Sequence, residues 1–529
     1  MTRLRSYRAL SSGSGLPHPI CLMIVMGLLT SLPAFSQPDI LDREVTLSRQ
    51  STTMYDLLSQ VSRQTGYFFV YDSDLINNQQ RVRIGSATLP LRSLLAEVLD
   101  DPGLDFKVLD QHILIFQPVV ATPGEPAPDM PPEEESSSFV VRGRVIDHET
   151  GTPLPHANIM IEGKGLGTIS NMEGVFQFRL HQSYRHETMK VSYMGYKSQT
   201  FPLELVDGRH IEVMMETDYI SMQEVIIRYY DPETIVREAL AKRFDNYSNK
   251  PVFHTSFYRE GVTRNRKLLN YSEAIFKIYK ADYGNMLDTD QAVLLKSRQI
   301  TNADHTDTLI LKIKGGVRSA LELDIMKSLP GFLDPELMHE VDFSSVDIVS
   351  RDGRSMYAIE FEQTNLEFLP VFKGIFFIDM ENMALVSAEF EVHPKHIDKS
   401  SHIFIARLDR RHSLQFDRIH YAVHYQYVNG RYHLSHVRGE LQMRFRPRNR
   451  LFSTRYQAFL EMVVGRIDEN DVSRFSRRET FRTHTTFIDQ DLEYDYAFWG
   501  DYNIIPPEKQ VTEAFSEIRS KIESIVPEE

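Results

Sequence analysis

Residues 140–178 constrain the fold of this chain more than any other stretch, and they read VVRGRVIDHETGTPLPHANIMIEGKGLGTISNMEGVFQF. Three short runs within it alternate apolar and polar residues: Val141–Ile146, Ala157–Glu162 and Val175–Leu180. Turn-forming residues separate these runs at 150–153 and again at 171–174. Alternation with a period of two, interrupted by Gly, Pro and Asn, is typical of strands in a small all-β sandwich. The stretch therefore predicts a β-sandwich.

Individual residues in this stretch fit that prediction. Gly143 allows close packing of neighbouring strands, the pair Thr150-Gly151 permits a tight turn with positive φ, and Ala157 is small enough for the core. The sequence GRVIDHETGTPLPHANIMIEGKGLGTISNMEGVFQF, with MKVSYMGYKSQTFPL after it, resembles the carboxypeptidase regulatory-like domain. That resemblance implies a transthyretin-like β-sandwich over residues 139–216.

The catalytic domain of a zinc carboxypeptidase is not expected here. Such an enzyme holds its metal with a His-x-x-Glu pair and a distant His. None of the 19 histidines is followed by Glu at the third position, and the HExxH arrangement does not occur. The resemblance is thus to the accessory domain of the enzyme alone.

The first 36 residues predict a signal peptide. Its basic start contains Arg3, Arg5 and Arg8. An apolar run, Ile20–Leu32, follows, and the small residues Ala34 and Ser36 favour cleavage before Gln37. A membrane anchor is the alternative, but the apolar run is short for a spanning helix. The only cysteine, Cys21, lies in this run, so the mature chain has no thiol and no disulfide.

The charge of the chain limits its partners. Removing the three arginines of the signal peptide changes the formal net charge from −14 to −17. An acidic protein without a long basic patch repels phosphate groups, so no nucleic-acid partner is expected. We expect an exported protein that is periplasmic or associated with the outer membrane.

Residues 39–117 contain a duplicated β-α-β unit. Six equivalences at a constant shift of 37 define it: Val45 with Val82, Leu57 with Leu94, Leu58 with Leu95, Val61 with Val98, Gly66 with Gly103 and Phe69 with Phe106. The phrase LLSQVSRQTGYFFVYDSDLI resembles the secretin and TonB short N-terminal domain (STN domain). This resemblance implies a periplasmic adaptor that meets components of the TonB system. Alternatively, any small α/β repeat could give the pattern.

A Pro- and Glu-rich stretch, 118–138, then predicts an extended linker.

Residues 217–529 predict a large, curved antiparallel β-sheet with a few helices. The expected strands are Tyr219–Arg228, Val252–Glu260, Lys267–Lys280, Thr308–Lys314, Ser355–Gln363, Gly374–Asp379, Ala384–Val392, Ser413–Val428, Arg431–Arg446 and Thr454–Val464. The pair Asn429-Gly430 predicts a type I′ hairpin turn. One helix is expected over Thr234–Phe244, with Asp231 as its N-cap, and another over Gln510–Ile525.

Two further resemblances concern this last domain. The sequence GIFFIDMENMALVSAEFEV resembles the repeated hairpin of lipoprotein-carrier folds, which implies a half-barrel around an apolar cavity. The segments FYRE (Phe257–Glu260) and FWGDYNIIPPE (Phe498–Glu508) resemble parts of Bacteroidetes-type envelope proteins that carry a regulatory-like domain.

Several groups of side chains suggest chemistry, and each has a simpler interpretation. Histidines are frequent in one region: His393, His396, His402, His412, His420, His424, His433 and His436. His420 and His424 share a strand face and could bind a metal, but Asp417 would point to the opposite face.

Four carboxylates could suggest glycoside hydrolysis: Glu360, Glu362, Glu389 and Glu391. Their i, i+2 spacing favours the solvated face of adjacent strands. Four phenylalanines are expected in the core, with a ligand cavity as the alternative: Phe372, Phe376, Phe377 and Phe390.

The sequence therefore predicts a mainly β multidomain protein with an α/β adaptor, a transthyretin-like sandwich and a curved antiparallel sheet domain. It predicts no catalytic, cofactor-binding or metal-binding residues. The expected function is non-catalytic binding or scaffolding of envelope or outer-membrane proteins. The alternative is a carrier of a lipid or other apolar ligand in the last domain, and a hydrolase is the third interpretation.

Overall fold

The computed structural model describes residues 40–71, 75–76, 80–99, 103–109, 112–117, 138–218, 231–285, 288–301, 312–313, 316–364, 370–400, 405–407, 412–447, 452–481, 499–509 and 511–513. The predicted signal peptide, the strand expected over Tyr219–Arg228, nearly all of the linker and most of the last predicted helix lie outside these residues. Contacts divide the chain into two units, one formed by 1–68 with 78–103 and the other by 69–77 with 104–529. The protein is mainly β, as the sequence predicts.

The first unit contains most of the duplicated segment, without the last strand of each copy. Its elements are β1 (Glu44–Leu47), β2 (Gln50–Thr53), α2 (Met54–Thr65), β4 (Arg81–Ile84), β5 (Ala87–Pro90) and α3 (Leu91–Leu99). Strand β1 pairs with β5 and β2 with β4, so each copy exchanges strands with the other. Helix α2 ends at Gly66, whose φ of 78° is the left-handed conformation that a C-cap requires. Strands β2 and β5 were not predicted, because each has only four residues and little apolar alternation.

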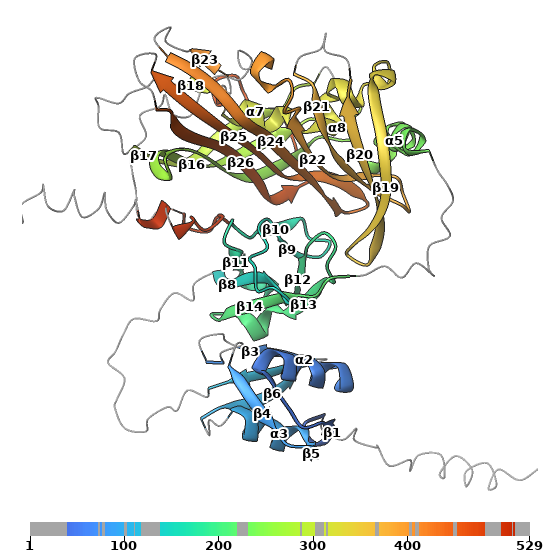
Figure 1. Cartoon of the computed structure of the whole chain (residues 1–529), viewed down its shortest axis with the longest axis vertical. Helices are drawn as coiled ribbons and strands as arrows, with labels where there is room; N and C mark the ends of the chain where they lie inside the picture. Colours follow the sequence, from blue (N-terminus) through green and yellow to red (C-terminus); the bar gives the residue numbers. More distant parts are fainter. Residues whose placement is uncertain are drawn as a thin grey trace, which may run out of the picture. The chain divides into compact units, whose positions relative to one another are not determined.

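The second unit begins with a three-stranded sheet, β3 (Phe68–Tyr71), β7 (His112–Phe116) and β6 (Asp105–Leu109), and continues into a two-sheet sandwich (Figure 1). One sheet of the sandwich contains β11 (Val175–His181), β8 (Ser138–Asp147) and β14 (His210–Met215). The other contains β13 (Gln199–Pro202), β12 (Thr188–Ser192), β9 (Asn158–Ile161) and β10 (Leu166–Ile169). A Cβ atom on Gly143 would lie 2.4 Å from the carbonyl oxygen of Ile211. The predicted close packing at this glycine is confirmed.

The large sheet of the second unit has a continuous antiparallel order. From one edge to the other it contains β17 (Gln291–Thr301), β16 (Lys267–Lys280), β15 (Val252–Arg264), β26 (Thr454–Asp468), β25 (Arg431–Pro447), β24 (His412–Val428), β22 (Leu385–Val392), β21 (Phe372–Asp379), β20 (Arg354–Gln363) and β19 (Val341–Arg351). Positive φ at Asn429 and Gly430 confirms the predicted type I′ turn. Leu166 of β10 pairs with Arg466 of β26, so one sheet of the sandwich continues into the large sheet.

Two strands of the large sheet were missed, and both contain a bulge. The pairing register shifts within β17 around Leu295 and within β19 between Ser344 and Val346. An extra residue on one strand interrupts the two-residue alternation, although β24 and β25 were predicted despite such irregularities. Of the strand predicted over Thr308–Lys314, the described residues contain only β18 (Lys312–Ile313), which pairs with β23 (Ile405–Arg407).

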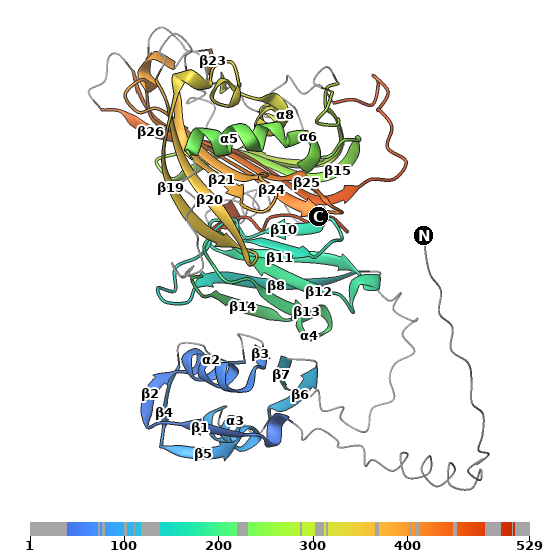
Figure 2. The same ribbon diagram turned by 90° about the vertical axis from the view of Figure 1, so that its right-hand side faces the viewer.

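Helices cover one face of the large sheet (Figure 2). They are α5 (Pro232–Ala241), α6 (Arg243–Asn246), α7 (Val317–Glu322) and α8 (Ile325–Ser328). The side chain of Asp231 accepts a hydrogen bond from the backbone N–H of Thr234, which confirms the predicted N-cap of α5. Among the described residues, no helix combines the length and the apolarity needed to span a membrane.

The apolar core lies between these helices and the sheet. Phe332, in the short 3₁₀ helix Gly331–Leu333, packs on Phe361 with ring centroids 4.9 Å apart. Phe376 and Phe390 are buried in the same cluster, as predicted, and Phe372 is partly buried against it. Phe377 points to the other face and is partly exposed, so its assignment to the core was wrong. A carrier with a cavity on this face would require the helices and Phe332 to move away.

Candidate functional site

The face of the large sheet opposite the helices, here called the outer face, carries a row of alternating charges. Five residues on adjacent strands β17, β16, β15, β26 and β25 stand directly opposite one another and form this charge row: Arg298, Glu273, Arg259, Glu461 and Arg438. Glu273, Arg259 and Glu461 are completely buried. Opposite charges on facing strands attract one another, and the cost of burying them requires that each be paired.

Glu461 is the centre of the charge row. Its Oε2 lies 2.7 Å from Nε of Arg259 and 3.2 Å from Nη1 of Arg438. Burial alone would raise the pKa of the Glu461 carboxyl, but Arg259 and Arg438 hold this pKa well below its usual value. The guanidinium of Arg438 is also paired with Glu440, 2.6 Å away. Glu461 is therefore ionised across the physiological pH range.

The charge row also fixes the C-terminal segment. The carboxylate of Glu508 accepts hydrogen bonds from both terminal nitrogens of Arg259, at 2.9 and 3.2 Å. The ring of Trp499 packs on Phe257 with centroids 5.7 Å apart. The structure thus joins the two segments that resemble Bacteroidetes-type proteins, FYRE and FWGDYNIIPPE, although Phe498 itself lies outside the described residues. No sequence pattern predicted that these segments pair.

A histidine cluster lies next to the charge row, where the sandwich contacts the sheet. Nε2 of His436 lies 2.9 Å and Nε2 of His156, from the sandwich, lies 3.3 Å from Oε1 of Glu461. The ring of His424 stacks on that of His436, with centroids 5.3 Å apart. Burial lowers the pKa of both His156 and His424 well below the usual value, so both imidazoles are neutral.

The histidine cluster borders a cavity of ≈ 190 Å³, which is also lined by Ser192. His156, His436 and Glu461 place one ligand atom each within 4.8 Å of one another, and they are the residues in the described part of the chain that could hold a metal ion. His424 and His436 were among the histidines that the sequence suggested as candidate metal ligands, whereas His156 and Glu461 were not. These two are far apart in the chain, and no spacing pattern connects them.

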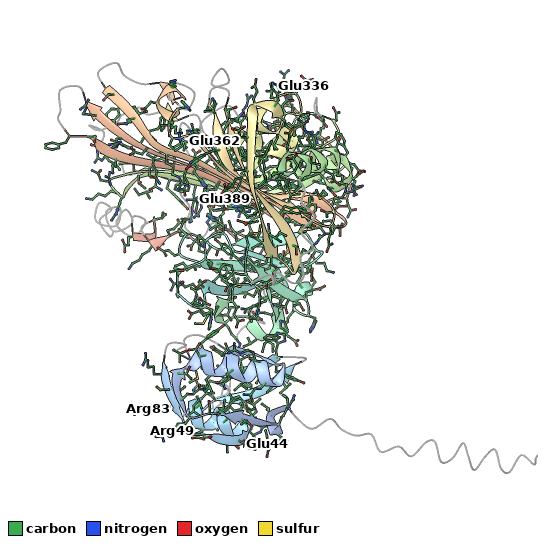
Figure 3. All side chains as sticks on the ribbon, turned by 45° about the vertical axis from the view of Figure 1, so that its right-hand side comes forward. Glu44, Arg49, Arg83, Glu336, Glu362 and Glu389 are labelled. Carbon is green, nitrogen blue, oxygen red and sulfur yellow. The ribbon has the colours of Figure 1, made fainter. Side chains whose placement is uncertain are left out.

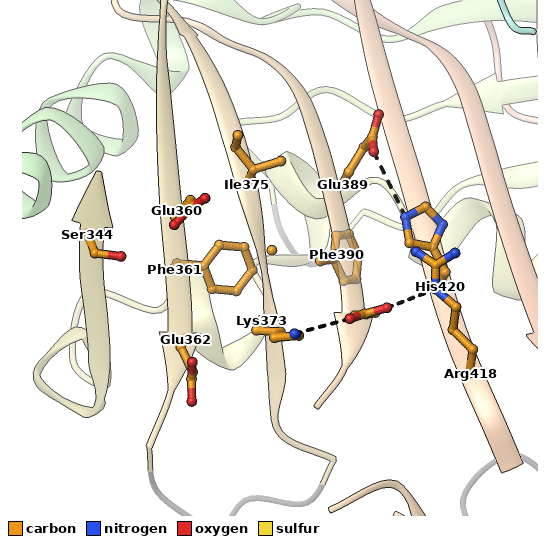
Figure 4. A pocket seen from close by; sticks show the side chains of 12 residues that line it. Ser344, Glu360, Phe361, Glu362, Lys373, Ile375, Glu389, Phe390, Arg418 and His420 are labelled. Carbon is orange, nitrogen blue, oxygen red and sulfur yellow. Dashed lines mark hydrogen bonds and ion pairs between the residues drawn. The ribbon is translucent and has the colours of Figure 1, made fainter. Parts of the chain in front are cut away.

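A second polar site is a groove of ≈ 420 Å³ further along the outer face, shown in Figure 4. It is lined by charged residues of β20, β21, β22 and β24: Glu360, Glu362, Lys373, Glu389, Glu391, Arg418 and His420. Glu391 is bound by Arg418 at 2.9 Å and by Lys373 at 3.4 Å. Burial raises the pKa of Glu391, but hydrogen bonds from Arg418 and Lys373 outweigh this effect and lower it.

The charged neighbours of the groove carboxylates argue against a glycosidase pair. Glu362 and Glu391 lie on β20 and β22, which are separated by β21, so their backbones are about 10 Å apart. Lys373 stands between them in the same register. A general acid needs a carboxyl with a raised pKa, whereas Glu391 has a lowered one. The groove is a surface of alternating charges.

The pair His420 and His424 does not converge on one site. His420 lies 4.0 Å from Glu389, whereas Nδ1 of His424 lies 2.8 Å from the hydroxyl of Ser387. Asp417 is paired with Arg444 at 2.7 Å. His402 and the side chain of His412 lie outside the described residues. The pair that sequence spacing suggested is thus held by separate partners.

Comparison with known proteins supports one part of the assignment. The family model described as CarboxypepD_reg-like domain matches residues 141–227. The sandwich is thus similar to CarboxypepD_reg-like domains. Domains of this kind are in general non-catalytic.

Other comparisons add little. No curated protein matches the chain. Among solved structures, a DUF1329 family protein from Desulfovibrio piger aligns with 46% of this chain and 96% of its own, at 12% identity. The TM-score of 0.21 is too low to assign a shared fold.

Proposed function

We propose that this chain is a non-catalytic binding or scaffolding protein of the cell envelope. The observation that carries the proposal is the pairing of its buried charges with one another. Glu461, Arg259, Arg438 and Glu508 neutralise one another beneath the CarboxypepD_reg-like sandwich. Side chains held in such pairs are poorly suited to activate a substrate. They hold parts of the chain together instead, because Arg259 binds Glu508 of the C-terminal segment and Glu461 contacts His156 of the sandwich.

The groove on the outer face is the surface that we propose for a partner. It alternates carboxylates with Lys373 and Arg418, so it suits a polar protein surface of complementary charge. Glu360 is exposed, and among the described residues it has neither a hydrogen bond nor an ion pair to its side chain. Its carboxylate is thus available to a basic group of the partner.

The location in the envelope rests on sequence. The signal peptide predicts export, and the STN-like segment suggests contact with TonB-system components at the periplasmic side of the outer membrane. The Bacteroidetes-type segments around Arg259 and Glu508 support the same setting. Carriage of an apolar ligand is the alternative, and it requires the helix-covered face to open.

Site-specific photocrosslinking in intact cells tests the proposal. A photoreactive residue at Glu360 is compared with one at Glu336, an exposed position on the opposite, helix-covered side (Figure 3). We expect discrete crosslinks to envelope proteins from position 360 only, and a loss of these crosslinks when Arg418 is changed to Glu. Identical products from both positions would contradict the proposal. So would turnover of a substrate by the purified chain that a single substitution abolishes.

A further inference from the structure

We propose that His156, His436 and Glu461 form a binding site for one divalent transition-metal ion, of which Zn²⁺ is the natural probe. The site lies between the CarboxypepD_reg-like sandwich, which supplies His156, and the large sheet, which supplies His436 and Glu461. It is distinct from the groove of the proposed function and independent of any partner.

The distances between the ligand atoms already approach those of a metal site. Oε1 of Glu461 lies 2.9 Å from Nε2 of His436 and 3.3 Å from Nε2 of His156. In a tetrahedral zinc site with bonds of about 2.0–2.2 Å, neighbouring ligand atoms are about 3.3–3.5 Å apart. All three ligand atoms lie within 4.8 Å of one another, so side-chain rotations that bring the two imidazoles to this spacing admit the ion.

Buried polar atoms without a hydrogen-bond partner are the second observation that supports an ion at this site. Nε2 of His156 is buried and lies 3.3 Å from the carboxylate of Glu461. It nevertheless has no hydrogen-bond partner, because the imidazole is not oriented for a hydrogen bond to this carboxylate. The hydroxyl of Ser192 also has no partner, and Ser192 is 1% exposed. Ser192 and both histidines line the same cavity of ≈ 190 Å³, which has room for a water molecule on the ion. Buried polar atoms normally have partners, and a bound ion with its water supplies them.

The backbone conformation of His156 is the third observation that supports a binding site here. Its φ of 61° lies in the left-handed region, which disfavours residues with a side chain. Glycine would adopt this conformation freely, so the imidazole is held here at a cost in conformational energy. Strained residues of this kind cluster at ligand-binding sites.

The surrounding charges determine which ions fit. Arg259 and Arg438 approach only Oε2 of Glu461, which directs Oε1 toward the histidines. Arg259 also binds Glu508, and Arg438 also binds Glu440. With Glu461, three negative charges therefore face the two positive charges of the arginines. The excess negative charge accommodates a cation. Two imidazoles and one carboxylate favour Zn²⁺ or Cu²⁺ over Mg²⁺ and Ca²⁺, which prefer oxygen ligands.

Zinc binding to the mature full-length chain, purified without a histidine tag and stripped with a chelator, tests this site. The variant His156→Gly removes the imidazole and relieves the positive-φ strain, so we expect it to fold as well as the parent chain. His186→Gln is the matched control, because the side chain of His186 is 84% exposed on the same sandwich. Bound zinc is counted by elemental analysis, and affinity is measured by titration of the fluorescence of Trp499, the only tryptophan.

We expect one zinc ion per chain in the parent protein and in His186→Gln, and at least a tenfold loss of affinity in His156→Gly. Mg²⁺ at the same concentration should leave the fluorescence unchanged. Equal zinc binding by the parent chain and His156→Gly would overturn the proposal, as would a parent chain that binds no stoichiometric zinc. A urea titration of the stripped proteins verifies that His156→Gly remains folded.

Discussion

Substitution of Glu461 by Gln is the most direct test of the charge row. Glu461 is completely buried, and its carboxylate contacts Arg259 at 2.7 Å, Arg438 at 3.2 Å and His436 at 2.9 Å. Glutamine has nearly the same shape, but it removes the negative charge and directs an NH₂ group at donors. The substitution therefore leaves two buried guanidinium groups without the anion between them.

The expected loss of stability follows from this geometry. Removing one partner of a buried ion pair destabilises a protein by about 3–5 kcal/mol, because the remaining charge is buried and uncompensated. Arg259 retains Glu508 and Arg438 retains Glu440, which limits the loss to the lower part of that range. We therefore expect Glu461→Gln to cost about 3 kcal/mol.

Urea denaturation followed by tryptophan fluorescence measures this loss. Trp499 is the only tryptophan, and it packs on Phe257 beside the charge row, so its emission reports on this part of the second unit. The matched control is Asp417→Asn, which breaks an exposed ion pair with Arg444 on the same sheet. Exposed pairs contribute about 0.2–1 kcal/mol.

If Glu461→Gln and Asp417→Asn shift the midpoint equally, the buried ion pairs of the charge row stabilise the second unit no more than an exposed pair does. The same conclusion would follow if the urea midpoint reported by the fluorescence of Trp499 were unchanged in Glu461→Gln.

Three further predictions concern other parts of the chain. Burial lowers the pKa of His433 to about 4, so between roughly pH 6.5 and 4 the unfolded chain binds a proton that the folded chain does not. Stability should decrease as the pH falls through this window, by up to about 3 kcal/mol from this group, and His433→Asn should show a flatter pH profile in urea denaturation. In Gly143→Ala, the new Cβ meets the Ile211 carbonyl at 2.4 Å, so we expect a loss of about 2 kcal/mol or more, measured as a lower melting temperature; no change would show that β8 and β14 can separate. Gly430→Val forces a β-branched residue into the left-handed region at φ 84°, and we expect a destabilisation of about 1–2 kcal/mol, whereas Gly85→Val, with open space around its Cβ position and no positive φ, should cost less.

Local patterns determined much of the architecture. The alternation in residues 141–146 and 175–180, the left-handed cap at Gly66 and the Asn429-Gly430 turn are set by neighbours in sequence, so the sandwich, helix α2 and the β24–β25 hairpin were predictable. Strands β17 and β19 were not predicted; each contains a bulge, but so do predicted strands such as β24, so the bulge alone does not explain the difference. The short helices α7 and α8 were missed as well, because one or two turns leave too few residues for a recognisable pattern.

Only the tertiary structure decided which charges meet. The sequence shows FYRE and FWGDYNIIPPE as separate segments, yet Arg259 binds Glu461 and Glu508, which lie 202 and 249 residues further along the chain. His156 reaches the same carboxylate from another domain. Strand register and the docking of the sandwich set these contacts, and both depend on the packing of the whole second unit. Residue types were visible in the sequence, but the site exists only because distant strands bring those residues to one row.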